Sequence, residues 1–294
     1  MIKTDRPTPP PFFSIVIPTL NEEKFLPRLL GDISKQTFRE FEVIHVDGFS
    51  SDSTCEKAAE FTKKMSFQTI QVKKRNVSYQ RNTGGQKAKG KWVIFMDADN
   101  RLKRSFLSQL QLKLEAKPQT DVFTCLLDSS KSNAVMKNLL NLCNVILLAT
   151  AKIRPLAAGA LIGIRRTHLK DLKFNCEASM SEDHQFVEAA VKKGLTFTVF
   201  SQPRYFFSLR RFEKEGSLKM ITSYARSGAV LLAGPKFERF LPDYPMQGGT
   251  GYDEVSSIHG LLPSMRDIIS VTTKSQQQRV QKSLARFLQM INDI

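Results

Sequence analysis

Cysteine is scarce in this chain of 294 residues. The four cysteines are widely separated, and no two of them form a Cys-x-x-Cys pair: Cys55, Cys125, Cys143 and Cys176. This spacing indicates neither a disulfide framework nor a zinc site made of paired cysteines. We therefore expect reduced, buried thiols, as in a cytoplasmic protein.

Long apolar segments are also missing. The apolar stretch between Lys137 and Lys152 holds 14 residues, three of them asparagine, whereas a membrane-spanning helix needs about 20 apolar residues. The opening residues, MIKTDRPTPPPFF, are rich in proline and contain no apolar core of a signal peptide. The sequence therefore predicts neither a spanning helix nor a signal peptide.

Acidic residues are outnumbered by basic ones. The 44 Lys and Arg residues against 28 Asp and Glu give a formal net charge of +16. Such a balance is compatible with nucleic acid, an anionic membrane surface or phosphorylated substrates as partners. Hydrophobic residues make up 41% of the chain and charged residues 24%. That usage excludes a disordered, collagen-like or multi-span membrane chain.

Short apolar runs alternate with helical patterns in the first half of the chain. Strands are predicted at 14–18, 41–48, 67–72 and 92–96, and helices at 26–33 and 106–114. Ser53 and Glu56 have the spacing of a capping box and predict another helix start. The alternation is typical of an α/β fold with a doubly wound, mostly parallel sheet, in which ligands bind beyond the carboxyl ends of the strands.

The second half of the chain is less regular. Strands are predicted at 121–127, 161–164 and 195–200, and helices at 134–151, 182–193, 210–232 and 280–291. Residues 1–12 are expected to form a flexible tail before the first strand.

Carboxylates follow three of the predicted strands. Glu22 comes after the first strand, Asp47 ends the second, and Asp97 and Asp99 follow the fourth, so a parallel sheet would bring them to one edge. A single acid after a strand is most often a turn or cap residue, but acids after three strands indicate a ligand site. The D-x-D spacing of Asp97 and Asp99 suits a hard divalent cation.

Nine basic residues and no acid lie between positions 62 and 91. A solvated basic face accounts for most of them. Arg81 differs because Asn82, Gly84 and Gly85 follow it. Small residues permit a close approach of the backbone, which would let this arginine reach a phosphate.

These motifs together resemble glycosyltransferase family 2, with its Rossmann-like glycosyltransferase A fold. The resemblance is carried by SIVIPTLNEE, VIHVDGFSSDST, RNTGGQKAKGKWVIFMDAD, AAGALIGIRR, SEDHQF and SLRRFEKEG, which occur in the family's order over residues 13–235. It implies an inverting enzyme that transfers a sugar from a UDP- or GDP-sugar to a hydroxyl acceptor with Mn2+ or Mg2+. It also implies a catalytic domain at 13–235, with a nucleotide-binding half at 13–118 and an acceptor half at 119–235, followed by a C-terminal loop and helical extension at 236–294.

The resemblance also implies which residues bind the nucleotide. The nucleoside would be held around Pro18, Thr19 and Glu22. Asp47 would accept a hydrogen bond from the base, and Arg81 would help to fix the nucleotide.

Metal binding and catalysis are likewise assigned by the resemblance. Asp99 would ligate the metal, and Asp97 would face the ribose or the water shell of the metal. Asp183 would be the catalytic base, with Glu182 as the other candidate, although both could simply be the acidic first turn of a helix. A mobile loop that closes over the diphosphate would carry Arg210 and Arg211.

The partners are less closely defined by the sequence. A lipid-linked or polysaccharide acceptor is compatible with it, as is peripheral binding to the anionic inner face of a membrane. A nucleotidyltransferase is an alternative, although its Gly-rich, Lys-bearing first loop is missing. A nucleic-acid-binding protein is another, although the chain has no aromatic-rich basic strand motif. We expect a cytoplasmic protein without a nucleic-acid partner. The sequence is compatible with a homo-oligomer and does not define the oligomeric state.

Overall fold

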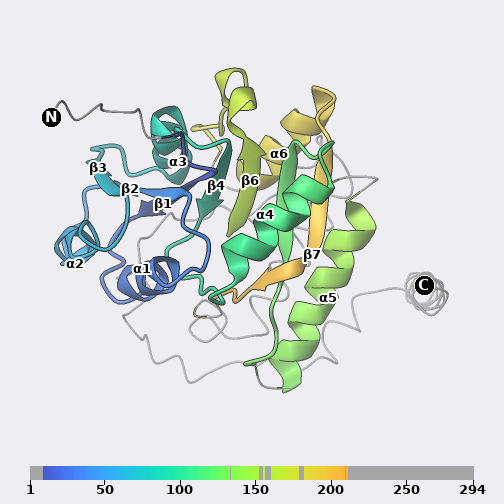
Figure 1. Cartoon of the computed structure of the whole chain (residues 1–294), viewed down its shortest axis with the longest axis horizontal. Coiled ribbons are helices and arrows are strands. Elements are labelled where there is room, and N and C mark those ends of the chain that lie inside the picture. The colour runs from blue at the N-terminus through green and yellow to red at the C-terminus, as the bar shows by residue number, and fades with distance from the viewer. Residues whose placement is uncertain are drawn as a thin grey trace, which may run out of the picture. The chain divides into compact units, whose positions relative to one another are not determined.

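The computed structural model describes residues 9–132, 134–151, 155, 160–178, 182–208 and 210, all within the first of two units, Met1–Glu254. These residues form a seven-stranded sheet with helices on both faces (Figure 1). Most of the predicted tail, Arg211 and the predicted C-terminal extension lie outside the described residues.

The sheet has the strand order β3-β2-β1-β4-β6-β5-β7. Four strands are parallel: β1 (Phe13–Thr19), β2 (Phe41–Asp47), β3 (Phe67–Gln71) and β4 (Trp92–Met96). The antiparallel strand β6 (Leu161–Arg165) lies between β4 and β5 (Val122–Leu127), and β7 (Phe197–Tyr205) runs parallel to β5. The sheet is thus doubly wound and mostly parallel, as expected, and its strand order reverses beside β1.

Two hydrophobic cores cover the two faces of the sheet, because side chains alternate along each strand. Ile15 and Ile17 of β1 face a core that includes the buried side of α1 (Leu26–Ser34), α4 (Phe106–Ala116) and α5 (Ala134–Thr150), with Ala58 of α2 (Thr54–Ala59). Val16 faces the other core, which includes Phe186 of α6 (Glu182–Lys192) and residues after the short helix η1 (Arg166–Lys170). Within the described ranges, no helix is long and apolar enough to span a membrane.

Helix α3 (Val77–Lys87) was not predicted from the sequence. It has no apolar stripe, because its buried residues are polar, basic or glycine: Ser78, Gln80, Arg81, Gly84 and Gly85. Gly84 lets the helix lie directly on β1, since a Cβ atom there would be 2.3 Å from Cγ1 of Val16. The close approach expected at this glycine is therefore an approach of α3 to the sheet.

The predicted capping box at the start of α2 is wrong in its detail. The helix begins at Thr54, but the side chain of Ser53 makes no capping hydrogen bond. Asp52 accepts instead, from the backbone N–H of Thr54 at 3.0 Å and from its hydroxyl at 2.5 Å. Local side-chain competition for the helix start explains the difference.

Replacement of Gly84 tests the contact between α3 and β1. We expect Gly84→Ala to lower the free energy of unfolding by about 1–3 kcal/mol, because the added methyl group overpacks the contact with Val16. Gly31→Ala is the matched control: Gly31 lies within α1, and no described atom is within 4 Å of a Cβ placed there. Alanine should stabilise that helix by roughly 0.5–1 kcal/mol. Urea denaturation measures the free energy of unfolding of both variants. A Gly84→Ala protein as stable as the parent would contradict the described contact.

Candidate active site

The ends of β1 and β2 are joined by a chain of buried hydrogen bonds. The hydroxyl of Thr19 donates to Oδ1 of Asp47 at 3.0 Å and lies 2.8 Å from Nε2 of His45. Burial lowers the pKa of His45 to about 4, so its ring is neutral at pH 7. Since the Thr19 proton is used on Asp47, His45 donates from Nε2 and accepts at Nδ1, where the hydroxyl of Thr69 lies at 3.1 Å.

Asp47 is buried and organises the loop that follows β2. It accepts from the backbone N–H of Ser50 at 2.9 Å and from the Ser50 hydroxyl at 2.5 Å. Burial alone would raise the pKa of Asp47, but these hydrogen bonds and that of Thr19 outweigh burial and hold the pKa below its usual value. Asp47 therefore carries a negative charge at neutral pH.

Gln80 is a structural residue of this edge that the sequence did not reveal. Its side-chain nitrogen donates to the backbone oxygen of Thr19 at 2.6 Å and to that of Val46 at 2.9 Å. It thereby ties α3 to the ends of β1 and β2. A lone glutamine in a polar segment has no distinguishing pattern, so only the structure identifies its role.

Arg210 bridges two of the predicted site carboxylates. Its two terminal nitrogens donate to the two oxygens of Glu22 at 2.9 and 2.6 Å, and its Nε lies 3.0 Å from Oδ2 of Asp99. This fork geometry gives strong, charge-assisted hydrogen bonds. Burial nevertheless raises the pKa of Glu22 to about 7. Arg210, which was predicted to meet a diphosphate, thus contacts Asp99, the carboxylate that was predicted to bind the metal.

Arg81 bridges a second pair of carboxylates. It donates to Oδ1 of Asp97 at 3.0 Å and to Oε1 of Glu182 at 2.8 Å, and only 3% of its side chain is exposed. Burial opposes its charge, but the two carboxylates and Asp183 raise the pKa of Arg81 above its usual value. A permanently charged side chain therefore joins α3, the end of β4 and the start of α6.

Asp183 follows Glu182 in the first turn of α6, as predicted. Burial is the main cause that raises its pKa to about 7, and the negative charge of Glu182 adds to it. The positive charge of Arg81 and the backbone N–H of His184, which donates to Oδ1 at 2.8 Å, act in the opposite direction. A carboxylate with such a pKa can accept a proton near neutral pH.

Stacked aromatic rings and two hydrogen bonds of the Asn82 side chain hold the start of α6 against α3. Phe186 stacks on Phe174 at 4.0 Å between ring centroids, and the guanidinium of Arg81 lies 5.2 Å from the Phe174 ring. The side chain of Asn82 donates to the backbone oxygen of Phe174 at 2.8 Å and accepts from its N–H at 2.9 Å. Arg81 and Asn82 together therefore set the position of Glu182 and Asp183.

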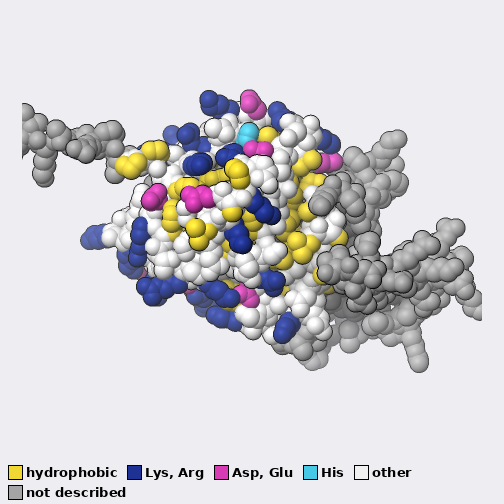
Figure 2. Space-filling view, turned by 45° about the vertical axis from the view of Figure 1, so that its right-hand side comes forward, with side chains coloured by type: hydrophobic (Ala, Val, Ile, Leu, Met, Phe, Trp, Pro, Cys, Tyr) yellow, Lys and Arg dark blue, Asp and Glu magenta, His cyan; other side chains and the backbone are white. Residues whose placement is uncertain are grey.

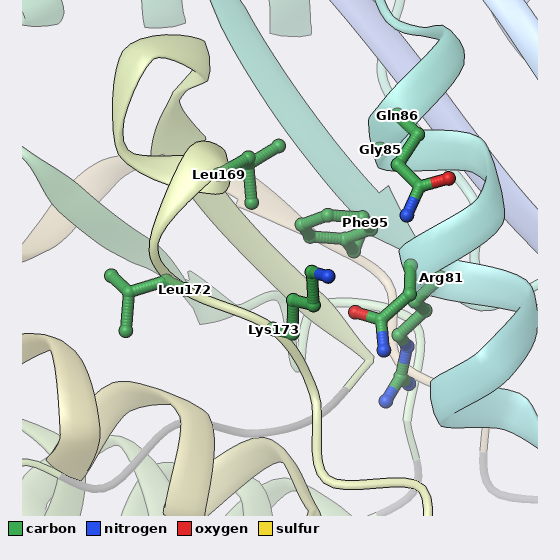
Figure 3. A pocket seen from close by; sticks show the side chains of 8 residues that line it. Arg81, Gly85, Gln86, Phe95, Leu169, Leu172 and Lys173 are labelled. Carbon is green, nitrogen blue, oxygen red and sulfur yellow. The ribbon is translucent and has the colours of Figure 1, made fainter.

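A small pocket lies beside Arg81, which is one of its lining residues (Figure 3). It is formed by α3, β4 and the segment from η1 onward, and its lining includes Gly85, Phe95, Leu169 and Lys173. Its lining does not include Asp97, Asp99 or Asp183. This pocket is therefore not the place where the predicted catalytic carboxylates meet.

The predicted site residues thus fall into two groups bridged by arginine. Glu22 and Asp99 share Arg210, whereas Asp97 and Glu182 share Arg81 beside Asp183. Two other predicted residues occupy the end of β1, where Pro18 pairs with Val46 and Thr19 with Asp47. Arg211 lies outside the described residues.

Asp97 and Asp99 have the oxygen ligands that Mn2+ and Mg2+ prefer, so the residue types fit the expected cation. Among the described residues, however, no group of three His, Cys, Asp or Glu side chains is assembled to hold a metal. A cation at Asp99 would therefore need further ligands from the donor or from water. Arg210 already lies 3.0 Å from Oδ2 of Asp99, so a cation that takes this oxygen would displace the arginine.

The described residues have the glycosyltransferase A fold. Residues 14–172, more than half of the chain, match the family model described as glycosyl transferase family 2. The chain belongs to that family.

Two curated relatives are similar to parts of the chain. The poly(ribitol-phosphate) beta-N-acetylglucosaminyltransferase TarS of Staphylococcus aureus strain MW2 is 27% identical over 207 residues, which cover 68% of this chain and 36% of the relative. A PGL/p-HBAD biosynthesis glycosyltransferase of Mycobacterium bovis BCG is 38% identical over 94 residues, covering 31% and 37%. The chain thus spans little more than a third of the length of these relatives.

Solved structures show the same fold. TarS 1-349 of S. aureus in complex with UDP matches with a TM-score of 0.54 and 23% identity, over 68% of this chain and 62% of that one. The mannosyltransferase PcManGT of Pyrobaculum calidifontis, in complex with GDP-Man and Mn2+, matches with a TM-score of 0.58 and 21% identity, over 69% and 58%. The glycosyltransferase A fold expected from the sequence is therefore confirmed.

The raised pKa of Asp183 makes a prediction about stability. A carboxyl group whose pKa is raised by folding stabilises the protein below its unfolded pKa, and this contribution is lost as the pH rises through the folded pKa. For Asp183 that window runs from 3.8 to about 7. We expect the free energy of unfolding to fall with pH more steeply in the parent than in Asp183→Asn. Both proteins keep Glu22, whose pKa is raised to about 7, and His45, whose pKa is lowered to about 4, and these two groups act in opposite directions in this window. Urea denaturation at both ends of the window measures this, and equal slopes would contradict the burial of Asp183.

Proposed function

We propose that this chain is a metal-dependent, inverting glycosyltransferase that uses a UDP- or GDP-sugar. The observation that carries the proposal is the gathering of Asp97, Asp99 and Asp183 at one edge of the sheet, each close to an arginine. The solved structures support the donor class, because TarS was obtained with UDP and with UDP-GlcNAc, and PcManGT with GDP-Man and Mn2+.

The first role of the chain is to hold the donor diphosphate. When bound, a divalent cation would stabilise the charge that develops on the leaving phosphate oxygen. Arg210 would exchange its contacts with Glu22 and Asp99 for contacts with phosphate oxygens. Such charge-assisted hydrogen bonds strengthen as negative charge grows on the diphosphate.

The second role is proton transfer at the acceptor. Asp183 would take the proton of the acceptor hydroxyl. The hydroxyl oxygen of the acceptor would attack the anomeric carbon, and the bond from that carbon to the diphosphate would break. A single displacement of this kind inverts the anomeric configuration and needs one base. Arg81 would hold Asp97 and Glu182 in place during this step, because its ion pairs are buried.

The acceptor we propose is a hydroxyl group of a cell-envelope glycan or polyol-phosphate polymer. TarS, to which the chain is similar, is named for poly(ribitol-phosphate), and a net charge of +16 suits an anionic polymer. The basic side chains are spread over the visible face of the described surface (Figure 2). The same charge supports a cytoplasmic protein that binds an anionic membrane surface peripherally.

Donor binding tests the proposal directly. We expect UDP or GDP with Mn2+ to raise the melting temperature of the parent protein, and we expect Asp99→Asn to lose the metal-dependent part of this shift because it loses a charged ligand. Asp171→Asn, at an exposed position outside the site, is the control that should keep the shift. A parent protein that melts at the same temperature with and without every nucleotide would contradict the proposal.

The assignment of the base makes a separate prediction. Asp183→Asn should bind UDP or GDP as the parent does and lose sugar transfer by at least about 100-fold, because proton transfer to a positioned base contributes ~10²–10⁴ in rate. Transfer assays and calorimetry on the same preparation separate the two effects. Glu182→Gln is the companion variant: if it loses transfer and Asp183→Asn does not, Glu182 is the base.

A further inference from the structure

Phe49 has a backbone conformation that is unusual for a bulky residue. Its φ angle is +65°, in the left-handed region, where the side chain of an L-residue crowds its own backbone. Asn21 is the other described non-glycine residue with positive φ, at 54°, but asparagine tolerates this region better than other residues. Phe49 therefore has a backbone conformation that its residue type disfavours.

The ring of Phe49 is not buried in compensation. Phe49 is 53% exposed, and it belongs to neither hydrophobic core. Residues held in unfavourable conformations without a packing reason concentrate at functional sites. The exposed ring and the unfavourable backbone together indicate that this side chain binds a ligand.

The neighbouring backbone is held independently of the ring. The N–H of Gly48 donates to the backbone oxygen of Thr19 at 2.8 Å, and Ser50 is bound to Asp47. Arg75 donates to the backbone oxygen of Phe49 at 3.3 Å. These contacts are all made outside the Phe49 side chain, so the ring can be replaced while the loop keeps its shape.

The position of Phe49 indicates which part of a ligand it meets. It lies two residues after Asp47, beyond the carboxyl end of β2 and beside the reversal of strand order at β1, where doubly wound sheets bind ligands. Asp183 and the acceptor half are on the other side of β1, beyond β4. Phe49 therefore lies on the β2 side of the strand-order reversal, next to Asp47, and not on the β4 side that carries Asp97 and the Arg81 ion pairs.

We propose that Phe49 is a stacking platform for the base of the nucleoside diphosphate. The inference rests on the proposed function, and it assigns to this ring an affinity for the planar base that is separate from the binding of the diphosphate. An aromatic face stacks on any nucleobase. The strained backbone serves to present the ring outward at the rim of the site.

The test compares nucleotides with inorganic pyrophosphate, which has no base. Calorimetric titrations with UDP, GDP and pyrophosphate in the presence of Mn2+ would use the parent, Phe49→Tyr, Phe49→Leu and Phe49→Asn. We expect Phe49→Tyr to keep the affinity for the nucleotide that the parent prefers. Phe49→Leu and Phe49→Asn should lose about 5- to 100-fold of it, the range that base stacking contributes. Pyrophosphate affinity should stay unchanged in all four proteins.

Two controls keep binding apart from folding. Leu112→Ala removes another exposed apolar side chain, 62% exposed and on α4, and should leave nucleotide affinity unchanged. Phe49→Asn should melt at or above the temperature of the parent, since asparagine suits the left-handed region. A lower melting temperature for Phe49→Asn would overturn the strain argument and with it the inference.

The outcomes separate this inference from the proposed function. Unchanged nucleotide affinity in Phe49→Leu and Phe49→Asn would overturn the role of Phe49 while the parent still binds its nucleotide. An equal loss of pyrophosphate affinity would overturn it too, because the ring would then act on the loop and not on the base. A parent that binds neither UDP nor GDP would contradict the proposed function and this inference together.

Discussion

Electrostatic repulsion among clustered carboxyl groups is the constraint on which this site depends. Glu22, Asp99, Asp97 and Glu182 lie in two arginine-bridged groups, and burial raises the pKa values of Glu22 and Asp183 to about 7. An arginine is always charged and can bind two carboxylates with its planar fork. The two bridging arginines therefore make the cluster compatible with a folded protein, and they also determine which oxygens a ligand can reach.

The two arginines differ in how they are placed. Arg81 is buried on α3 and held against Phe174, so its ion pairs belong to the framework of the domain. Arg210 follows β7, the last strand among the described residues, and contacts carboxylates that follow β1 and β4. In the proposed reaction, Arg81 stays in place and Arg210 exchanges its carboxylates for the diphosphate. In this proposal, the separation of a fixed charge from an exchangeable one would let the site bind a charged donor without losing its own order.

The sequence predicted most of the fold because the strands are apolar and end abruptly. The run WVIFM before Asp97 corresponds to β4, and SIVIP lies within β1. Helix α3 was missed because its buried face consists of polar residues and glycine, and the role of Gln80 was missed because one glutamine forms no pattern. The spacing of Asp97 and Asp99 indicated a shared ligand, whereas their pairing with different arginines depends on residues far apart in the chain. Such long-range ion pairs leave no local trace in a sequence.

The most direct test of the central claim is a crystal structure with Mn2+ and UDP or GDP. Anomalous scattering locates the manganese, and the density shows where the Arg210 side chain lies. The account predicts manganese bound to Asp99, Arg210 displaced from Glu22 onto the diphosphate, and Arg81 still between Asp97 and Glu182. Nucleotide bound elsewhere, with the Arg210 bridge intact and no manganese at Asp99, would contradict it.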